Sequence, residues 1–336
     1  MKKWLIVCIV LLAVGTVAAA LVGYQLNTRY GWLASTPVFH EIMATGDTRV
    51  RASVDTVRLG RELAPYIPED VALPDWLPWD APALLPRVLP HEVAVLGGAD
   101  FRQGNFNFTL FINEQRGGPV LPGYLNSQAR LKQRFPAVTW EEPGFTLQRR
   151  GILSVNGFLP LPSELESMVR ETWSAEPPAE PLTLLGGHLA EAVIDNRNGE
   201  ILTLMGALAP VWNMTLEQIR QNPMVEARLE LLTGISNVRV AVDFASVDNL
   251  LIQIRIEAEP EVGGQLGVMV PFAMPMLAQQ LQRRYGLTMQ PETSWNAADN
   301  TYQVDLSLTG IEVKLKDYFG KVVPRRPAAT AAPAAS

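Results

Sequence analysis

The chain has 336 residues, of which 48% are hydrophobic and 18% are charged, and its formal net charge is -6. This composition excludes a fully disordered chain, because it supplies enough apolar surface for a large core, and an acidic chain is not expected to bind nucleic acid. With one cysteine and three histidines, the chain cannot form an internal disulfide, and a structural zinc site is not expected.

The first element that the sequence predicts is a membrane-spanning helix over residues 4–24. No charge occurs between Lys3 and Arg29, and at about 1.5 Å per residue this run matches the roughly 30 Å hydrocarbon core of a bilayer. Lys2 and Lys3 place the amino terminus in the cytoplasm under the positive-inside rule. We therefore expect residues 1–29 to form a cytoplasmic tip and signal anchor in the bacterial inner membrane, with a periplasmic ectodomain.

A cleaved signal peptide is the alternative, because the small residues at 17–20 resemble a cleavage site, and the product would be periplasmic or secreted. Within the span, Gly15, Ala19 and Gly23 recur every four residues. Such a stripe lets two helices approach closely and is a candidate for self-association into a homodimer. The simpler explanation is that small residues are common in membrane spans.

A proline-rich segment follows at residues 65–90, within which prolines recur every four residues from Pro74 to Pro90. A regular helix is not expected through this spacing. Trp76 and Trp79 lie in the segment and are candidates for contact with a protein partner or with lipid headgroups. Packing of the two indoles against the body of the protein is the alternative.

The remainder shows the same order of patterns twice, in residues 30–178 and 179–323. Alternating apolar residues at 106–112 and 250–256 indicate a half-buried strand in each copy, and a helical segment follows at 131–135 and 281–285. Hairpins favour antiparallel pairing. We therefore predict an α+β fold of two similar units with antiparallel sheets, related by internal duplication; two unrelated α+β domains are the alternative.

Basic residues gather on the two matching helical segments. The candidates for anion or headgroup contacts are Arg130, Arg134, Arg283 and Arg284. Their alternative role is the polar face of two amphipathic helices. The last residues, 324–336, are rich in proline and alanine and are predicted to be disordered.

No pattern in the sequence indicates catalytic chemistry, a cofactor or a metal. His40, His91 and His188 are isolated from one another, and the glycine pairs do not form a phosphate-binding loop. The alternating Glu257, Glu259 and Glu261 fit a cation-binding edge or, more simply, a solvated strand end. We therefore assign no catalytic, cofactor-binding or metal-binding residue.

These observations predict a single-pass envelope protein whose non-catalytic ectodomain is a scaffold, adaptor or binding module for a protein or lipid partner. The binding surface is expected in a groove between the units or on an exposed sheet face. One alternative is a lipid or hydrophobic-ligand carrier, which requires a dry cavity. The other is an envelope hydrolase, which requires a deep pocket that holds His91 or His188 beside a carboxylate.

Overall fold

The computed structural model describes residues 48–68, 92–113, 136, 138–140, 146–147, 152–173, 186–209 and 229–322. The strands are β1 Val50–Val54, β2 Glu92–Asp100, β3 Asn105–Asn113, β4 Thr139–Trp140, β5 Thr146–Leu147, β6 Ile152–Pro160, β7 Ala190–Asp195, β8 Ile235–Ser246, β9 Asn249–Ala258, β10 Thr288–Asn296 and β11 Thr301–Thr309. The helices are α2 Thr56–Leu63, the 3-10 turn η2 Ala64–Tyr66, α6 Ser163–Thr172, α7 Glu200–Leu208, α10 Leu229–Thr233, α11 Pro260–Tyr285 and α12 Ile311–Val322.

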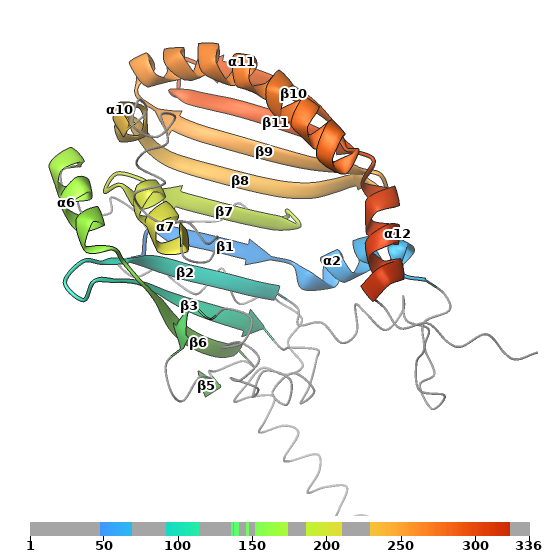
Figure 1. Cartoon of the computed structure of the whole chain (residues 1–336), viewed down its shortest axis with the longest axis horizontal. Helices are drawn as coiled ribbons and strands as arrows, with labels where there is room; N and C mark the ends of the chain where they lie inside the picture. Colours follow the sequence, from blue (N-terminus) through green and yellow to red (C-terminus); the bar gives the residue numbers. More distant parts are fainter. Residues whose placement is uncertain are drawn as a thin grey trace, which may run out of the picture.

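The eleven strands of the described ranges belong to one antiparallel sheet, with the order β10-β11-β9-β8-β7-β1-β2-β3-β6-β4 and with β5 paired to β6 (Figure 1). The predicted α+β class with antiparallel pairing is therefore confirmed. The pairing of β1 with β7, from Val50 opposite Ile194 to Val54 opposite Ala190, continues the sheet from one half of the chain to the other. Outward from this pair, the order is β2, β3, β6, β4 on one side and β8, β9, β11, β10 on the other.

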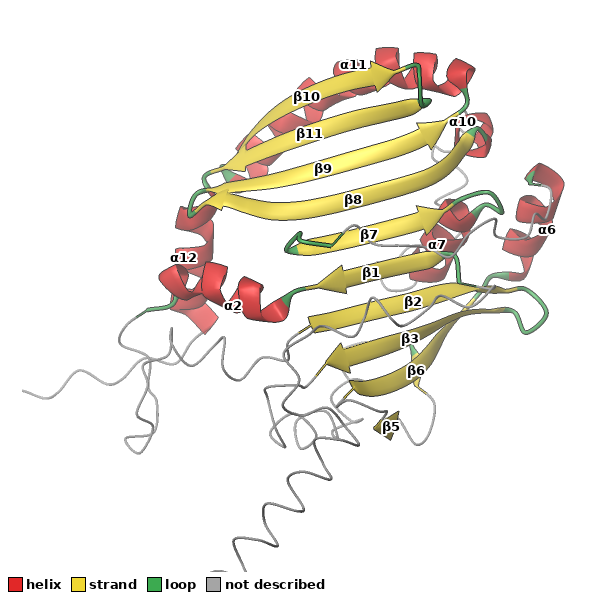
Figure 2. Cartoon of the chain, turned by 180° about the vertical axis from the view of Figure 1, so that it is seen from behind, coloured by secondary structure: helices red, strands yellow, loops and turns green. Residues whose placement is uncertain are grey.

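The two faces of the sheet differ because side chains alternate along each strand. One face is apolar and carries α7 and α11, with α11 lying along β10 and β11 (Figure 1). Val262 and Leu266 of α11 are buried there against Tyr302, Val304 and Leu306 of β11. The opposite face of β8, β9, β11 and β10 is polar, and none of the described helices covers it (Figure 2).

The helix α11 continues through Pro271 and Pro275, although proline cannot donate a hydrogen bond to the preceding turn. Pro260 stands in its first turn, where a missing N–H costs nothing. The helix ends at Gly286, whose φ of 66° is the left-handed conformation that glycine adopts easily. The predicted helical segment at residues 281–285 is thus the last part of this longer helix.

Helices from each half of the chain contact the other half. The helix α7, which follows β7, contacts β2, β3 and β6, and its buried Ala207 packs with Phe106 and Leu159. The short turn η2, which follows α2, contacts α12 at the other end of the sheet. Arg58 of α2 also forms an ion pair with Asp243 of β8. The two halves therefore share a core in addition to a sheet.

Within the described ranges, no helix combines the length and the apolar character that crossing a membrane requires. The predicted membrane span at residues 4–24, with its stripe of Gly15, Ala19 and Gly23, lies outside these ranges. Trp76, Trp79 and the tail at 324–336 also lie outside them, as do Arg130 and Arg134.

Candidate functional site

The polar face of the second half of the sheet is built from rows of side chains on adjacent strands. One row runs from Arg239 on β8 through Arg255 on β9 and Gln303 on β11 to Ser294 on β10. A second row, nearer one end of the sheet, contains Asn237, Glu257, Thr301 and Asn296 in the same strand order. Residues paired across strands project from the same face, so the sheet register gathers both rows on one surface.

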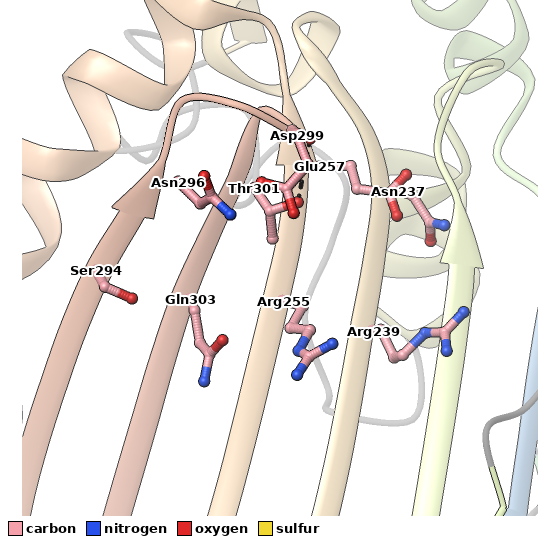
Figure 3. A pocket seen from close by; sticks show the side chains of 9 residues that line it. All are labelled: Asn237, Arg239, Arg255, Glu257, Ser294, Asn296, Asp299, Thr301 and Gln303. Carbon is pink, nitrogen blue, oxygen red and sulfur yellow. Dashed lines mark hydrogen bonds between the residues drawn. The ribbon is translucent and has the colours of Figure 1, made fainter.

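These rows line an open cavity of about 490 Å³ (Figure 3). Every residue that lines it is polar or charged; the lining is Asn237, Arg239, Arg255, Glu257, Ser294, Asn296, Asp299, Thr301 and Gln303. Pockets for drug-like molecules are mostly apolar. A hydrophilic ligand therefore suits this cavity better than a lipid chain does.

The charges in the cavity are separated into a basic part and an acidic part. Arg239 and Arg255 lie directly opposite each other on β8 and β9, and Figure 3 shows both side chains at the lower row. Glu257 and Asp299 lie at the upper row, next to Thr301. This arrangement offers guanidinium donors to an anionic group and carboxylate acceptors to hydroxyl or amine groups.

Arg239 also connects the cavity to charged residues inside the sheet. Its Nη1 lies 3.8 Å from Oε1 of Glu191, whose side chain is 3% exposed. Glu191 Oε2 accepts a hydrogen bond of 3.0 Å from the N–H of Gly186. Burial lowers the pKa of Arg51 on the neighbouring strand, although Glu92 and Glu191 act in the opposite direction. The polar character of this face therefore extends to the centre of the sheet.

A second cavity, of about 550 Å³, shares Glu257 and Asp299 with the first and lies around the turn between β10 and β11. It is also lined by Arg197 and Trp173, and by Asn300, which has a positive φ of 50°. The two cavities therefore adjoin at Glu257 and Asp299. On the same sheet face of the first half, a larger cavity of about 830 Å³ is lined by residues of β2, β3 and β6, including Asn107, Thr109, Asn156, Phe111 and Phe158.

The centre of the sheet holds a buried ionic group between β1 and β7. Arg49 Nη1 donates to Asp195 Oδ2 at 2.7 Å, and both side chains are at most 6% exposed. Arg197 donates two further hydrogen bonds to the same carboxylate, at 2.9 and 2.8 Å. Burial opposes ionisation of Asp195, but the hydrogen bonds from Arg197 and Arg49 outweigh it and hold its pKa below the ordinary value. This group stabilises the pairing of β1 with β7, which is the joint between the two halves of the sheet. Neither Arg49 nor Asp195 lines any of the three cavities.

His188 lies beside a carboxylate, which is one of the two conditions for the hydrolase alternative. The Nδ1 of His188 is 2.6 Å from Asp243 Oδ2. The other carboxylate oxygen, Asp243 Oδ1, accepts a hydrogen bond of 2.9 Å from the Leu189 N–H and forms an ion pair of 2.9 Å with Arg58. Burial opposes the ionisation of Asp243, but these partners lower its pKa. His188 lines none of the three cavities, so the pair attaches the turn before β7 to β8 and α2.

The structure separates the predicted site residues that it describes from the polar cavity. Arg283 and Arg284 are exposed in the last turn of α11, on the helix-bearing side of the sheet, and the Arg284 guanidinium lies 5.4 Å from the Tyr285 ring centroid. Of the three alternating glutamates, Glu257 lines both adjoining cavities and Glu259 lines the second, whereas Glu261 lies in the first turn of α11 and lines neither. In the described ranges, no group of His, Cys, Asp and Glu is arranged to hold a metal ion.

Sequence reasoning did not name Arg239, Arg255 or Gln303. A partial signal was present, because the apolar alternation at residues 250–256 assigns the intervening Gln253 and Arg255 to the opposite face. The position of Arg239 opposite Arg255 depends on the register of the β8–β9 hairpin. That register contains irregularities at both ends of β8, which alternation alone does not predict.

The chain matches no protein-family model, and no curated protein is significantly similar to it.

Proposed function

We propose that the ectodomain is a non-catalytic binding module whose polar sheet face holds a hydrophilic ligand with an anionic group. The observation that carries this proposal is the cross-strand pair of Arg239 and Arg255. Like charges directly opposite on a sheet are destabilising. Glu191 lies 3.8 Å from Arg239, and no ion pair among the described residues involves Arg255. A phosphate or carboxylate held between both guanidinium groups would offset their repulsion.

The neighbours of the arginine pair indicate the rest of the ligand. Gln303 and Ser294 continue the basic row with neutral donors and acceptors, while Glu257 and Asp299 offer carboxylates at the far side of the cavity. Hydroxyl groups donate well to carboxylates. The ligand class that this arrangement favours is therefore a hydroxyl-bearing anion, such as an acidic sugar or a sugar phosphate.

Titration of the full chain with glucose 6-phosphate tests this proposal, with glucose as the uncharged control ligand. Glucose 6-phosphate should bind saturably by calorimetry, and glucose more weakly. Arg255→Gln should weaken the binding of glucose 6-phosphate about tenfold or more, because it removes a charge-assisted hydrogen bond from the anion. Arg61→Gln, at an exposed position of α2, is the matched control and should bind as the wild type does. Equal affinity for both ligands, or for both variants, would contradict the proposal.

We further propose that residues 4–24 anchor this module in the bacterial inner membrane, with the module in the periplasm. The support is the uncharged run between Lys3 and Arg29 and the two lysines before it. Protease added to spheroplasts should then degrade residues beyond about 30, and alkaline carbonate should leave the chain in the membrane fraction. Full protection from protease, or release of the intact chain by carbonate, would count against this topology.

We also propose that the two halves of the ectodomain arose by internal duplication. The support is the strand order, in which β1, β2, β3, β6 and β4 correspond to β7, β8, β9, β11 and β10 outward from the centre of the sheet. In both halves the hairpin follows a strand and a helix. In an alignment of homologues, the sequence of the first half should be detectably similar to that of the second half. Halves that never align with each other would refute a common origin.

A further inference from the structure

The outer side of α11 is an apolar surface that no described element covers. Val268, Phe272 and Met276 are 74%, 77% and 54% exposed, and they follow one another at intervals of one helical turn. No charged residue occurs between Glu261 and Arg283. The inner side of the same helix already packs on β10 and β11 through Val262 and Leu266. An exposed patch of this kind on a folded protein marks an interaction site.

The residues along this outer side are arranged symmetrically about Phe272. Val268 and Met276 stand four residues before and after it, and Gln265 and Gln279 stand seven residues before and after it. At about 100° per residue, all of them lie within about 40° of the direction of Phe272 around the helix. Every one of these positions is exposed.

The symmetry extends to the charges at the two ends. Glu261 stands eleven residues before Phe272 and Arg283 eleven residues after it, and both are exposed on the same side of the helix. Within the described residues, neither forms an ion pair. When two copies of α11 lie antiparallel about Phe272, each Glu261 faces the Arg283 of the other copy. The sequence of the helix is thus complementary to itself in the antiparallel orientation.

We propose that the outer side of α11 is a dimer interface at which a second copy of this chain binds, with the two helices antiparallel and Phe272 on the two-fold axis. In this pair, Val268 packs against the second copy's Met276, and Glu261 pairs with the second copy's Arg283. A two-fold interface uses the same patch on both chains, so each favourable contact occurs twice. The pair leaves the polar cavity open, because α11 lies on the opposite face of the sheet.

A second copy fits this surface better than a lipid bilayer does. An anionic bilayer surface attracts Arg283 but repels Glu261 at the other end of the same stripe. The edge of the sheet is a poorer route to a dimer, because the edge strand β10 contains Pro291, which lacks a backbone donor. The antiparallel helix pair satisfies both the apolar centre and the charges of opposite sign at its ends.

Cysteine crosslinking of the full chain in cells tests the orientation. Cys8 is first replaced by serine, which removes the one natural thiol, and a short bifunctional maleimide is added. Phe272→Cys should give a crosslinked dimer, because position 272 meets itself on the axis. Gln265→Cys and Gln279→Cys should each fail alone, because the two copies of each position lie about 21 Å apart along the helices. Chains with these two changes should crosslink when they are expressed together.

Val313→Cys, on α12 and 69% exposed, is the control for collisional crosslinking and should remain monomeric. The absence of a dimer with Phe272→Cys, equal crosslinking with Val313→Cys, or crosslinking of Gln265→Cys with itself would overturn the proposal.

Charge reversal provides a second test, by co-purification of two differently tagged copies. Glu261→Arg and Arg283→Glu should each reduce co-purification about tenfold, because each change alters two symmetric ion pairs. The double variant should restore it, since the pairs are rebuilt with their charges exchanged. If Phe272→Glu leaves co-purification intact but abolishes binding to phosphatidylglycerol vesicles, lipid is the occupant and the dimer is refuted. Failure of glucose 6-phosphate binding would not affect these results.

Discussion

At the residue scale, the centre of the sheet depends on ionisable side chains that are almost completely buried. Asp195 accepts hydrogen bonds from Arg49 and Arg197, and Glu200 at the start of α7 is 3% exposed. Burial raises the pKa of Glu200 to about 7, with Asp195 acting in the same direction and Arg49 against it. The joint therefore contains one carboxyl that is stabilised as the ion and one that is stabilised as the neutral acid.

We predict that the protein becomes less stable as the pH rises from about 4.5 through 7. The folded pKa of Glu200 is raised above its ordinary value of 4.5, so the folded state holds the proton more strongly than the unfolded state does, and stability decreases as that proton is lost. The rise of the pKa from 4.5 to about 7 limits the loss from Glu200 to roughly 3.5 kcal/mol. Denaturant unfolding at pH 5, 6, 7 and 8 measures it.

Glu200→Gln should remove part of this pH dependence, because glutamine has no proton to lose. Burial also raises the pKa of Glu92 to about 7, so the remaining slope should disappear when Glu92→Gln is added. An unchanged slope in the double variant would show that neither carboxyl is responsible. Below pH 3.8 the trend should reverse, since the lowered pKa values of Asp195 and Asp243 make stability fall with acid.

At the element scale, the position of α11 depends on its close approach to the sheet. A Cβ atom at Gly263 would overlap the Trp295 ring on β10, whereas a Cβ at Gly264 would meet nothing within 4 Å. Gly263 is buried and Gly264 is exposed. Adjacent glycines in one helix therefore have different roles. Gly263 permits the close contact between helix and sheet, whereas Gly264 faces open space and is not needed for that contact.

These glycines form a matched pair for mutation. Gly263→Ala should destabilise the protein by about 1–3 kcal/mol, because the added methyl group forces Trp295 or the helix to move. Gly264→Ala should be neutral or stabilising by up to about 1 kcal/mol, because alanine favours the helix and has free space. Thermal unfolding followed by circular dichroism distinguishes the two. Equal destabilisation by both changes would show that helix propensity, and not packing, controls this region.

At the scale of the whole molecule, the two halves of the chain share their packing. Leu165 of α6 and Trp173, which directly follows α6, form a buried cluster with Leu202 of α7, the helix after the central strand of the other half. Tyr66 donates a hydrogen bond to the carbonyl of Val247, in the turn between β8 and β9. With the β1–β7 ladder, these contacts connect both halves through sheet, helices and turns.

We therefore expect the described body to unfold in one cooperative step. A fluorotryptophan label at Trp140 reports on the first half, a label at Trp295 reports on the second, and a label at Trp173 reports on the packing between them. All three resonances should change at the same urea concentration. Asp195→Ala should shift all three midpoints equally, since it leaves Arg49 buried without its main partner at a cost of about 3–5 kcal/mol. Two separate midpoints would show that the halves are independent domains.

The sequence alone determined the local features of the described body. The alternation at residues 250–256 predicts β9 and the direction of its side chains, and the segment at 281–285 is helical, because period and polarity act within a few residues. It did not determine that β1 would pair with β7, or that Arg239 would face Arg255. Those results depend on contacts between distant parts of the chain. The choice of neighbouring strands and the register of each hairpin are decided only when the whole sheet forms. The elements were therefore predictable from local physics, whereas the polar cavity and the interlocked core were decided by tertiary pairing.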